Sequence, residues 1–125
     1  MKAIDLKHIF DQGQDENIRA YLNFLDHLEV VDLLYLLDGD HYPKIIEILD
    51  NEILAEILPL LETSLLEELC LVMSTARLTH ILNLLETDDA AHIIRQFDSS
   101  KGKELLSLLD KGSQIDKIMS LSLIH

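Results

Sequence analysis

The chain has 125 residues, of which 48% are hydrophobic and 26% are charged, and this balance indicates one globular domain rather than a disordered tail. Acidic residues outnumber basic residues by 23 to 10, so the formal charge is −13. This charge argues against nucleic acid or an anionic membrane surface as a partner, because both require a basic face. A single cysteine excludes an intrachain disulfide, and no apolar run approaches the roughly 20 residues that cross a bilayer. We therefore expect a soluble, cytoplasmic module without direct membrane insertion.

The composition also predicts the fold class. Leucine and isoleucine dominate with 27 and 14 residues, whereas valine, threonine and glycine contribute only 3, 4 and 4. Leucine is a good helix former, whereas the scarce valine, threonine and glycine are common in turn-rich sheets. We expect an all-α domain.

The first predicted element is a helix within residues 1–14. Leu6, Ile9 and Phe10 keep a helical spacing, which then breaks at the polar stretch 11–14. We interpret this segment as an N-terminal capping helix.

A repeat of twelve residues begins at Asp15 and continues to residue 110 without gaps. Positions 4, 7, 8 and 11 of each block are mainly apolar, and this spacing places them on one face of a helix. Twelve residues hold roughly two and a half helical turns and a short connection. Each block therefore predicts one short helix whose apolar face must be covered by its neighbours, as in a solenoid. The blocks are 15–26, 27–38, 39–50, 51–62, 63–74, 75–86, 87–98 and 99–110.

Helix start signals fall at the block boundaries. The last residue of each block is acidic except Ser74, and an acid favours the N-terminus of the following helix. Ser64 and Glu67 have the spacing of a capping box. Cap-type residues follow the boundaries by one or two positions: Asn51, Ser64, Thr75, Asp88 and Ser99.

Glycines and prolines add stop signals. Gly39 and Gly112 lie at boundaries, where a left-handed residue can end a helix. Pro43 falls in a first helical turn, where a missing N–H costs little. Pro59 lies late in its block, so we predict that this helix ends early or kinks there. Residues 111–125 keep a weaker register and predict either a last capping helix or the start of a linker.

Catalytic motifs are absent from the sequence. The four glycines form no phosphate-binding loop, and the histidines form no zinc-type pair, so no enzyme is expected. Cys70 occupies a core column and is interpreted as a buried apolar residue. Small acidic clusters occur at 38–40, 67–68 and 88–89, and one or two carboxylates suffice for a weak, hydrated Mg²⁺ site.

Several short motifs accompany the gapless repeat: Gly39-Asp40-His41, Ala55-Glu56-Ile57-Leu58, Arg77-Leu78 and Thr87-Asp88-Asp89-Ala90-Ala91. Together with the block length, the helix number and the acidity, these motifs resemble the cytosolic N domain of MgtE-type magnesium transporters and channels. The resemblance covers essentially the whole chain.

The resemblance implies a right-handed superhelix of about nine or ten short helices. In this family a CBS domain pair, a connecting helix and a five-helix pore follow the N domain, and dimers form through those domains. Mg²⁺ binds between the N domain, the CBS pair and the cytosolic face of the pore. The ions hold a closed state at high magnesium, which places the domain at the cytosolic side of the inner membrane.

The resemblance also implies metal ligands. Glu56 matches the glutamate of the Ala-Glu-aliphatic-Leu segment, and Asp88 matches the first aspartate of an Asp-Asp-x-Ala-Asp segment. Asp89 lies beside Asp88 and is the weaker candidate. The last acid of that segment is His92 here, and imidazole is a poor ligand for a hard ion. Asp88 also suits a helix N-cap.

A second interpretation is a stand-alone helical-repeat scaffold that binds a protein partner, since flagellar motor-switch proteins have repeats of a related kind. The sequence contains no CBS pair or pore, and residues 120–125 do not resemble the acidic, glycine-rich entry to a CBS region. Both an excised regulatory domain and a free-standing relative therefore stay open.

Overall fold

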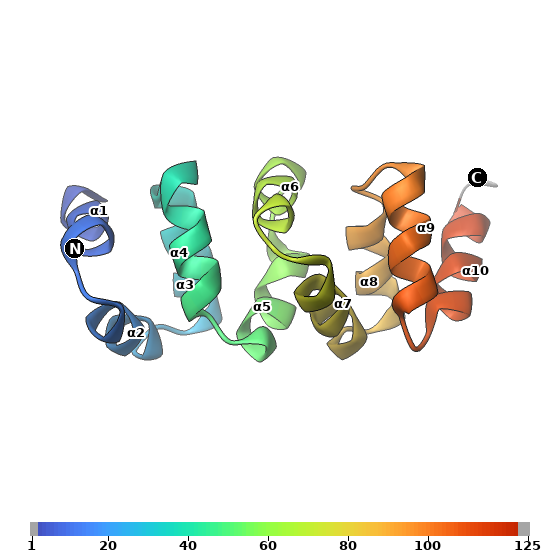
Figure 1. Cartoon of the computed structure of the whole chain (residues 1–125), viewed down its shortest axis with the longest axis horizontal. Helices are drawn as coiled ribbons and strands as arrows, with labels where there is room; N and C mark the ends of the chain where they lie inside the picture. The colour runs from blue at the N-terminus through green and yellow to red at the C-terminus, as the bar shows by residue number, and fades with distance from the viewer. Residues whose placement is uncertain (1–2, 123–125) are drawn as a thin grey trace.

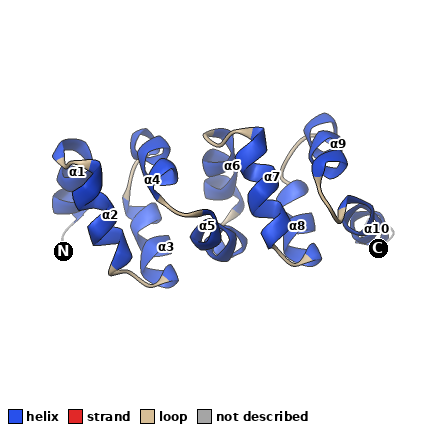
Figure 2. Ribbon diagram, turned by 60° about the horizontal axis from the view of Figure 1, so that its bottom comes forward, coloured by secondary structure: helices blue, strands red, loops and turns tan. Residues whose placement is uncertain are grey.

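The computed structural model describes residues 3–122, and this range is helical without a strand (Figure 2). The expected all-α class is therefore confirmed. No helix in this range has the length and apolar character needed to cross a membrane. The elements are α1 (Ala3–Gln12), α2 (Asp15–Asn23), α3 (His27–Leu36), the 3-10 helix η1 (Gly39–His41), α4 (Tyr42–Ile48), α5 (Asn51–Ile57), the 3-10 helix η2 (Leu58–Leu60), α6 (Thr63–Leu71), α7 (Thr75–Leu84), α8 (Thr87–Ile94), α9 (Ser99–Leu108) and α10 (Gly112–Ser122).

The helices follow the predicted twelve-residue register. Every block from residue 15 to residue 110 contains one helical unit, and each unit begins at the first residue of its block. The units succeed one another along the long axis of the molecule, so that α1 and α10 lie at opposite ends (Figure 1). A right-handed superhelix and the division at residues 14 and 110 stay predictions. The predicted end segments include residues 1–2 and 123–125, which lie outside the described range.

Helices pack mainly on the helix two positions away in the chain. α3 contacts α5, α5 contacts α7, and α7 contacts α9, whereas α2 contacts α4 and α4 contacts α6. At the C-terminal end α10 packs on α8 and α9. The molecule therefore has an odd-numbered and an even-numbered row of helices, and equivalent positions in one row are 24 residues apart.

The core consists of the predicted apolar columns. Positions 4, 7 and 8 of the central blocks are buried, and Leu54, Ile57 and Leu58 of the fourth block are fully buried. The column weakens where predicted, and the small residues Ala90 and Gly102 are buried there. Cys70 is also buried, and burial raises the pKa of its thiol to about 12. The prediction of a buried, apolar cysteine is confirmed.

The helix caps lie one residue earlier than most of the cap-type residues predicted. The last residue of each preceding block is the N-cap, and the side chains of Asp26, Ser74 and Asp98 accept hydrogen bonds from the third helical residue. The predicted capping box at Ser64 is wrong, because α6 begins at Thr63 with Glu62 as its N-cap. A capping box forms instead between Asp26 and Glu29.

The prediction that Gly39 and Gly112 end helices in a left-handed conformation is also wrong. No glycine in the described range has a positive φ, and both residues begin helices. At Gly112 the requirement is steric, since a Cβ atom would collide with the carbonyl oxygen of Leu106. The proline predictions are confirmed: Pro43 lies in the first turn of α4, and α5 ends at Ile57 before Pro59.

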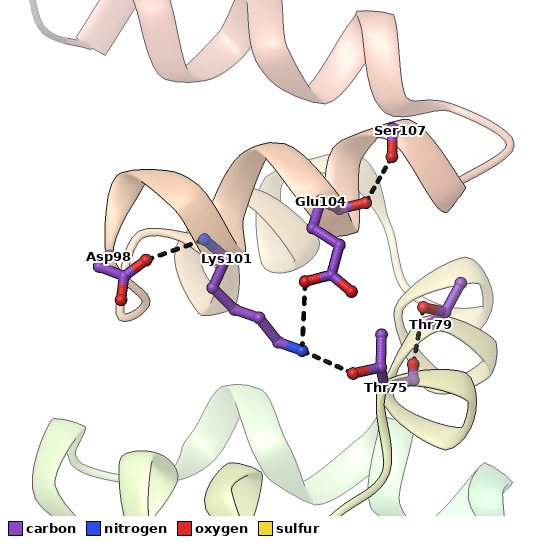
Figure 3. Close-up of polar contacts among 6 residues, drawn as sticks. All are labelled: Thr75, Thr79, Asp98, Lys101, Glu104 and Ser107. Atoms are coloured by element: carbon purple, nitrogen blue, oxygen red, sulfur yellow. Dashed lines mark hydrogen bonds and ion pairs between the residues drawn. The ribbon is translucent and has the colours of Figure 1, made fainter.

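Long basic side chains join helices within one row and between the two rows. The guanidinium of Arg77 in α7 donates to Asn51 Oδ1 at 2.9 Å and to the carbonyl oxygens of Ile46 and Leu49 at the end of α4. Burial lowers the pKa of Arg77 from its usual value. Lys101 of α9 similarly donates to Thr75 Oγ1 at 2.6 Å, while its backbone N–H is capped by Asp98 (Figure 3).

Candidate functional site: an acidic cleft

An open cleft of about 740 Å³ lies where α3, α5, η2, α7 and α8 approach one another. Four carboxylates line it, whereas no lysine or arginine does. Its floor includes Ala55 and Leu85, which are buried. The cleft residues, used below as the definition of the acidic cleft, are His27, Glu52, Ala55, Glu56, Pro59, Leu60, Leu84, Leu85, Glu86 and Asp89.

Pro59 lines the cleft at a position where a hydrogen bond found in the neighbouring helices is missing. In α3 and α7, the neighbours of α5 in the odd-numbered row, the side chain equivalent to Pro59 accepts a hydrogen bond from a backbone N–H 27 residues later in the chain. Tyr35 Oη accepts from Glu62 at 2.9 Å, and Asn83 Oδ1 accepts from Asp110 at 3.0 Å. Proline has no side-chain acceptor, so Pro59 cannot form the equivalent bond to Glu86.

Helix geometry positions the four carboxylates. Glu52 and Glu56 are four residues apart on α5, so they share one face of that helix. Glu86 is the N-cap of α8 and makes no capping bond through its side chain. Asp89 lies in the first turn of α8, where the helix dipole favours a negative charge.

The cleft brings together two of the three predicted metal ligands. Glu56 and Asp89 both line it, whereas Asp88 does not and is exposed on the first turn of α8. Asp88 is not the N-cap, because Glu86 takes that position. Sequence reasoning missed Glu52 and Glu86 as members of the site. The spacing of four residues between Glu52 and Glu56 was the available signal.

Glu56 has a partner within the cleft. His27 Nδ1, at the start of α3, lies 2.8 Å from Glu56 Oε2. Both side chains are more than half exposed, so solvent weakens the attraction between them. One carboxylate oxygen of Glu56 is thus engaged, and its other oxygen is not part of this contact.

The donor chemistry of the cleft fits Mg²⁺, which takes carboxylate and water oxygens. The geometry is incomplete, however, because no three ligand-type side chains converge on one point among residues 3–122. An ion held here would keep several waters or take ligands from another domain. His92, which replaces an acid of the resembled motif, is exposed at the last turn of α8.

The fold and the cleft together define an acidic, all-helical repeat domain. A family model described as the MgtE intracellular N domain matches residues 25–121, from the loop before α3 into α10. The chain therefore belongs to the MgtE intracellular N domain family, a domain family associated with magnesium transporters. No individual curated protein matches the chain.

Proposed function

We propose that this chain is the magnesium-sensing regulatory domain of an MgtE-type transporter or channel. High Mg²⁺ would close it onto a CBS domain pair and a transmembrane pore at the cytosolic side of the inner membrane. The observation that supports this proposal is the gathering of Glu52, Glu56, Glu86 and Asp89 around one open cleft in a chain of charge −13.

Repulsion among the carboxylates supplies the sensing step. Like charges at the cleft oppose any further approach of an acidic partner surface at low Mg²⁺. A divalent cation between the surfaces removes this repulsion and adds ligand bonds that exist only in the closed state. The ion therefore stabilises the closed arrangement by its higher affinity for that state.

The predicted ligands divide into two groups by position. Glu56 and Asp89 line the cleft, which supports an ion inside it, whereas the exposure of Asp88 supports an ion shared with a neighbouring domain. In both cases the remaining ligands are water or partner oxygens, which agrees with the preference of Mg²⁺ for retaining water.

Thermal melting of the chain during a Mg²⁺ titration tests the cleft. We expect millimolar Mg²⁺ to raise the Tm of the native chain, and NaCl of equal ionic strength to raise it less. The double variant E56Q/D89N should lose most of the magnesium-specific rise.

The matched control is E16Q/D116N, which removes the same charge from two exposed positions outside the cleft. It should keep the native response. Equal responses of the two double variants would show general screening and would contradict the site. In a full transporter, E56Q/D88N should raise the magnesium concentration required for closure.

A second function, a helical-repeat scaffold for protein interaction, is favoured by a different observation. Large apolar side chains are exposed in a regular pattern on this otherwise charged surface, among them Leu60 and Leu84.

A further inference from the structure

Four exposed leucines recur every 24 residues on the odd-numbered helices. Each is the last residue of its helical segment, at the ends of α3, η2, α7 and α9. Their exposed fractions are nearly equal, at 46%, 53%, 48% and 51%. We call this set the leucine row: Leu36, Leu60, Leu84 and Leu108.

The exposure of the leucine row does not result from loose helix ends. The residue after each leucine is another leucine, and all four of these are buried: Leu37, Leu61, Leu85 and Leu109. The even-numbered helices have no equivalent row. The corresponding positions there are Phe24, Ile48, Val72 and Gln96, which differ in chemistry and in burial.

Negative charge accompanies every leucine of the row. The second residue after each leucine is an exposed acid, giving the series Asp38, Glu62, Glu86 and Asp110. The leucines also lie at helix C-termini, which carry partial negative charge, and none of these segments has a basic residue in its last turn. Apolar contacts and negative potential thus alternate along one edge.

The spacing of the row matches a particular ligand shape. Helices packed side by side are roughly 8–10 Å apart, so four leucines span roughly 25–30 Å. Two turns of an α-helix, or seven residues, rise about 10.5 Å. A docked helix of about 22 residues with an apolar residue in every heptad would therefore meet each leucine once.

Charge complementarity selects the occupant. A second copy of this chain would bring the same acids against the row, and an anionic membrane would be repelled. We propose that the leucine row docks a basic amphipathic helix of a partner protein, with apolar residues at heptad spacing and lysine or arginine on either side. Two leucines of the row also line the acidic cleft, yet this docking needs no magnesium.

A synthetic peptide tests the proposal with the full chain in EDTA, so that the result is independent of magnesium sensing. The probe is a fluorescein-labelled peptide of about 22 residues with leucine at every seventh position, lysines flanking the leucines and alanine elsewhere. Fluorescence anisotropy should show saturable binding with one peptide per chain. The variant L60S/L84S should bind about tenfold more weakly or worse, because it removes the central apolar contacts.

The control variant F24S/L71S replaces two exposed apolar residues outside the row and should bind as the native chain does. Circular dichroism verifies that each variant is folded. If L60S/L84S unfolds, L36S/L108S is tested in its place. Equal binding of a scrambled peptide of the same composition, or insensitivity to both row variants, would overturn the proposal. So would absence of binding, preferential binding to phosphatidylglycerol vesicles, or sedimentation showing that the row joins two copies of this chain.

Discussion

His27 Nδ1 lies 2.8 Å from Glu56 Oε2, and this contact joins the start of α3 to α5 across the acidic cleft. The two residues are 29 positions apart in sequence but occupy neighbouring helices of the odd-numbered row. A group that binds Glu56 from inside the chain competes with any cation that approaches the same carboxylate.

Replacement of His27 by alanine should therefore strengthen magnesium binding at the cleft. The substitution frees Glu56 Oε2 from its contact with His27. We therefore expect the midpoint of the Mg²⁺-dependent Tm rise to move to lower Mg²⁺ concentration. The free energy of unfolding should change by less than about 1 kcal/mol, because the pair is exposed. An unchanged or higher magnesium midpoint in H27A would contradict competition for Glu56.

Replacement of Arg77 by leucine should destabilise the chain by about 2–4 kcal/mol, since it leaves the carbonyl oxygens of Ile46 and Leu49 without their donor. Urea denaturation measures this loss. R77K keeps the charge but not the planar fork of donors, so it should fall between the native chain and R77L. If lysine restored full stability, the fork geometry would be unimportant.

Two serines near block boundaries distinguish the observed caps from the predicted ones. Ser74 accepts from the Arg77 N–H as the N-cap of α7, and S74A should lower the free energy of unfolding by about 1 kcal/mol. Ser64 lies inside α6 and is exposed, so S64A should have almost no destabilising effect. Equal losses in thermal or urea melts would contradict the assigned helix boundaries.

Cys70 should resist alkylation in the native chain. Burial raises the pKa of its thiol from 9.0 to about 12, so the thiolate is scarce at pH 8. Iodoacetamide labelling followed by mass spectrometry should be slow in buffer and fast in urea. The unfolded thiol ionises near pH 9 and the folded thiol only near pH 12, so its contribution to stability declines between these values. C70A should lack that component of the decline.

The repeat predicted the fold closely because one physical requirement recurs in every block. The helix within a twelve-residue block is too short to be stable alone, and its apolar columns must be buried by neighbours. Leu54, Ile57 and Leu58 show this requirement in the fourth block. The cap positions were less predictable, because acids and hydroxyl residues occur together at each boundary, and the backbone decides which of them is the N-cap.

The acidic cleft was only partly predictable. Glu56 and Asp89 were found through motif resemblance, but Glu86 belongs to the cleft only because α8 approaches η2 in space. The early end of α5 at Pro59 was expected from the sequence. The sequence did not predict that this proline also removes a hydrogen bond between neighbouring units of the odd-numbered row, because that bond joins residues 27 positions apart.

The missing hydrogen bond at Pro59 has a mechanical consequence. On either side of Pro59, a side chain accepts a hydrogen bond from the backbone of a later loop. Tyr35 accepts from Glu62, and Asn83 accepts from Asp110. Tension applied between the two ends of the molecule would therefore lengthen it first near its middle, where Pro59 and Glu86 both line the acidic cleft. Elastic extension and the width of the acidic cleft would then vary together, so that a pull on either end changes the spacing of the carboxylates.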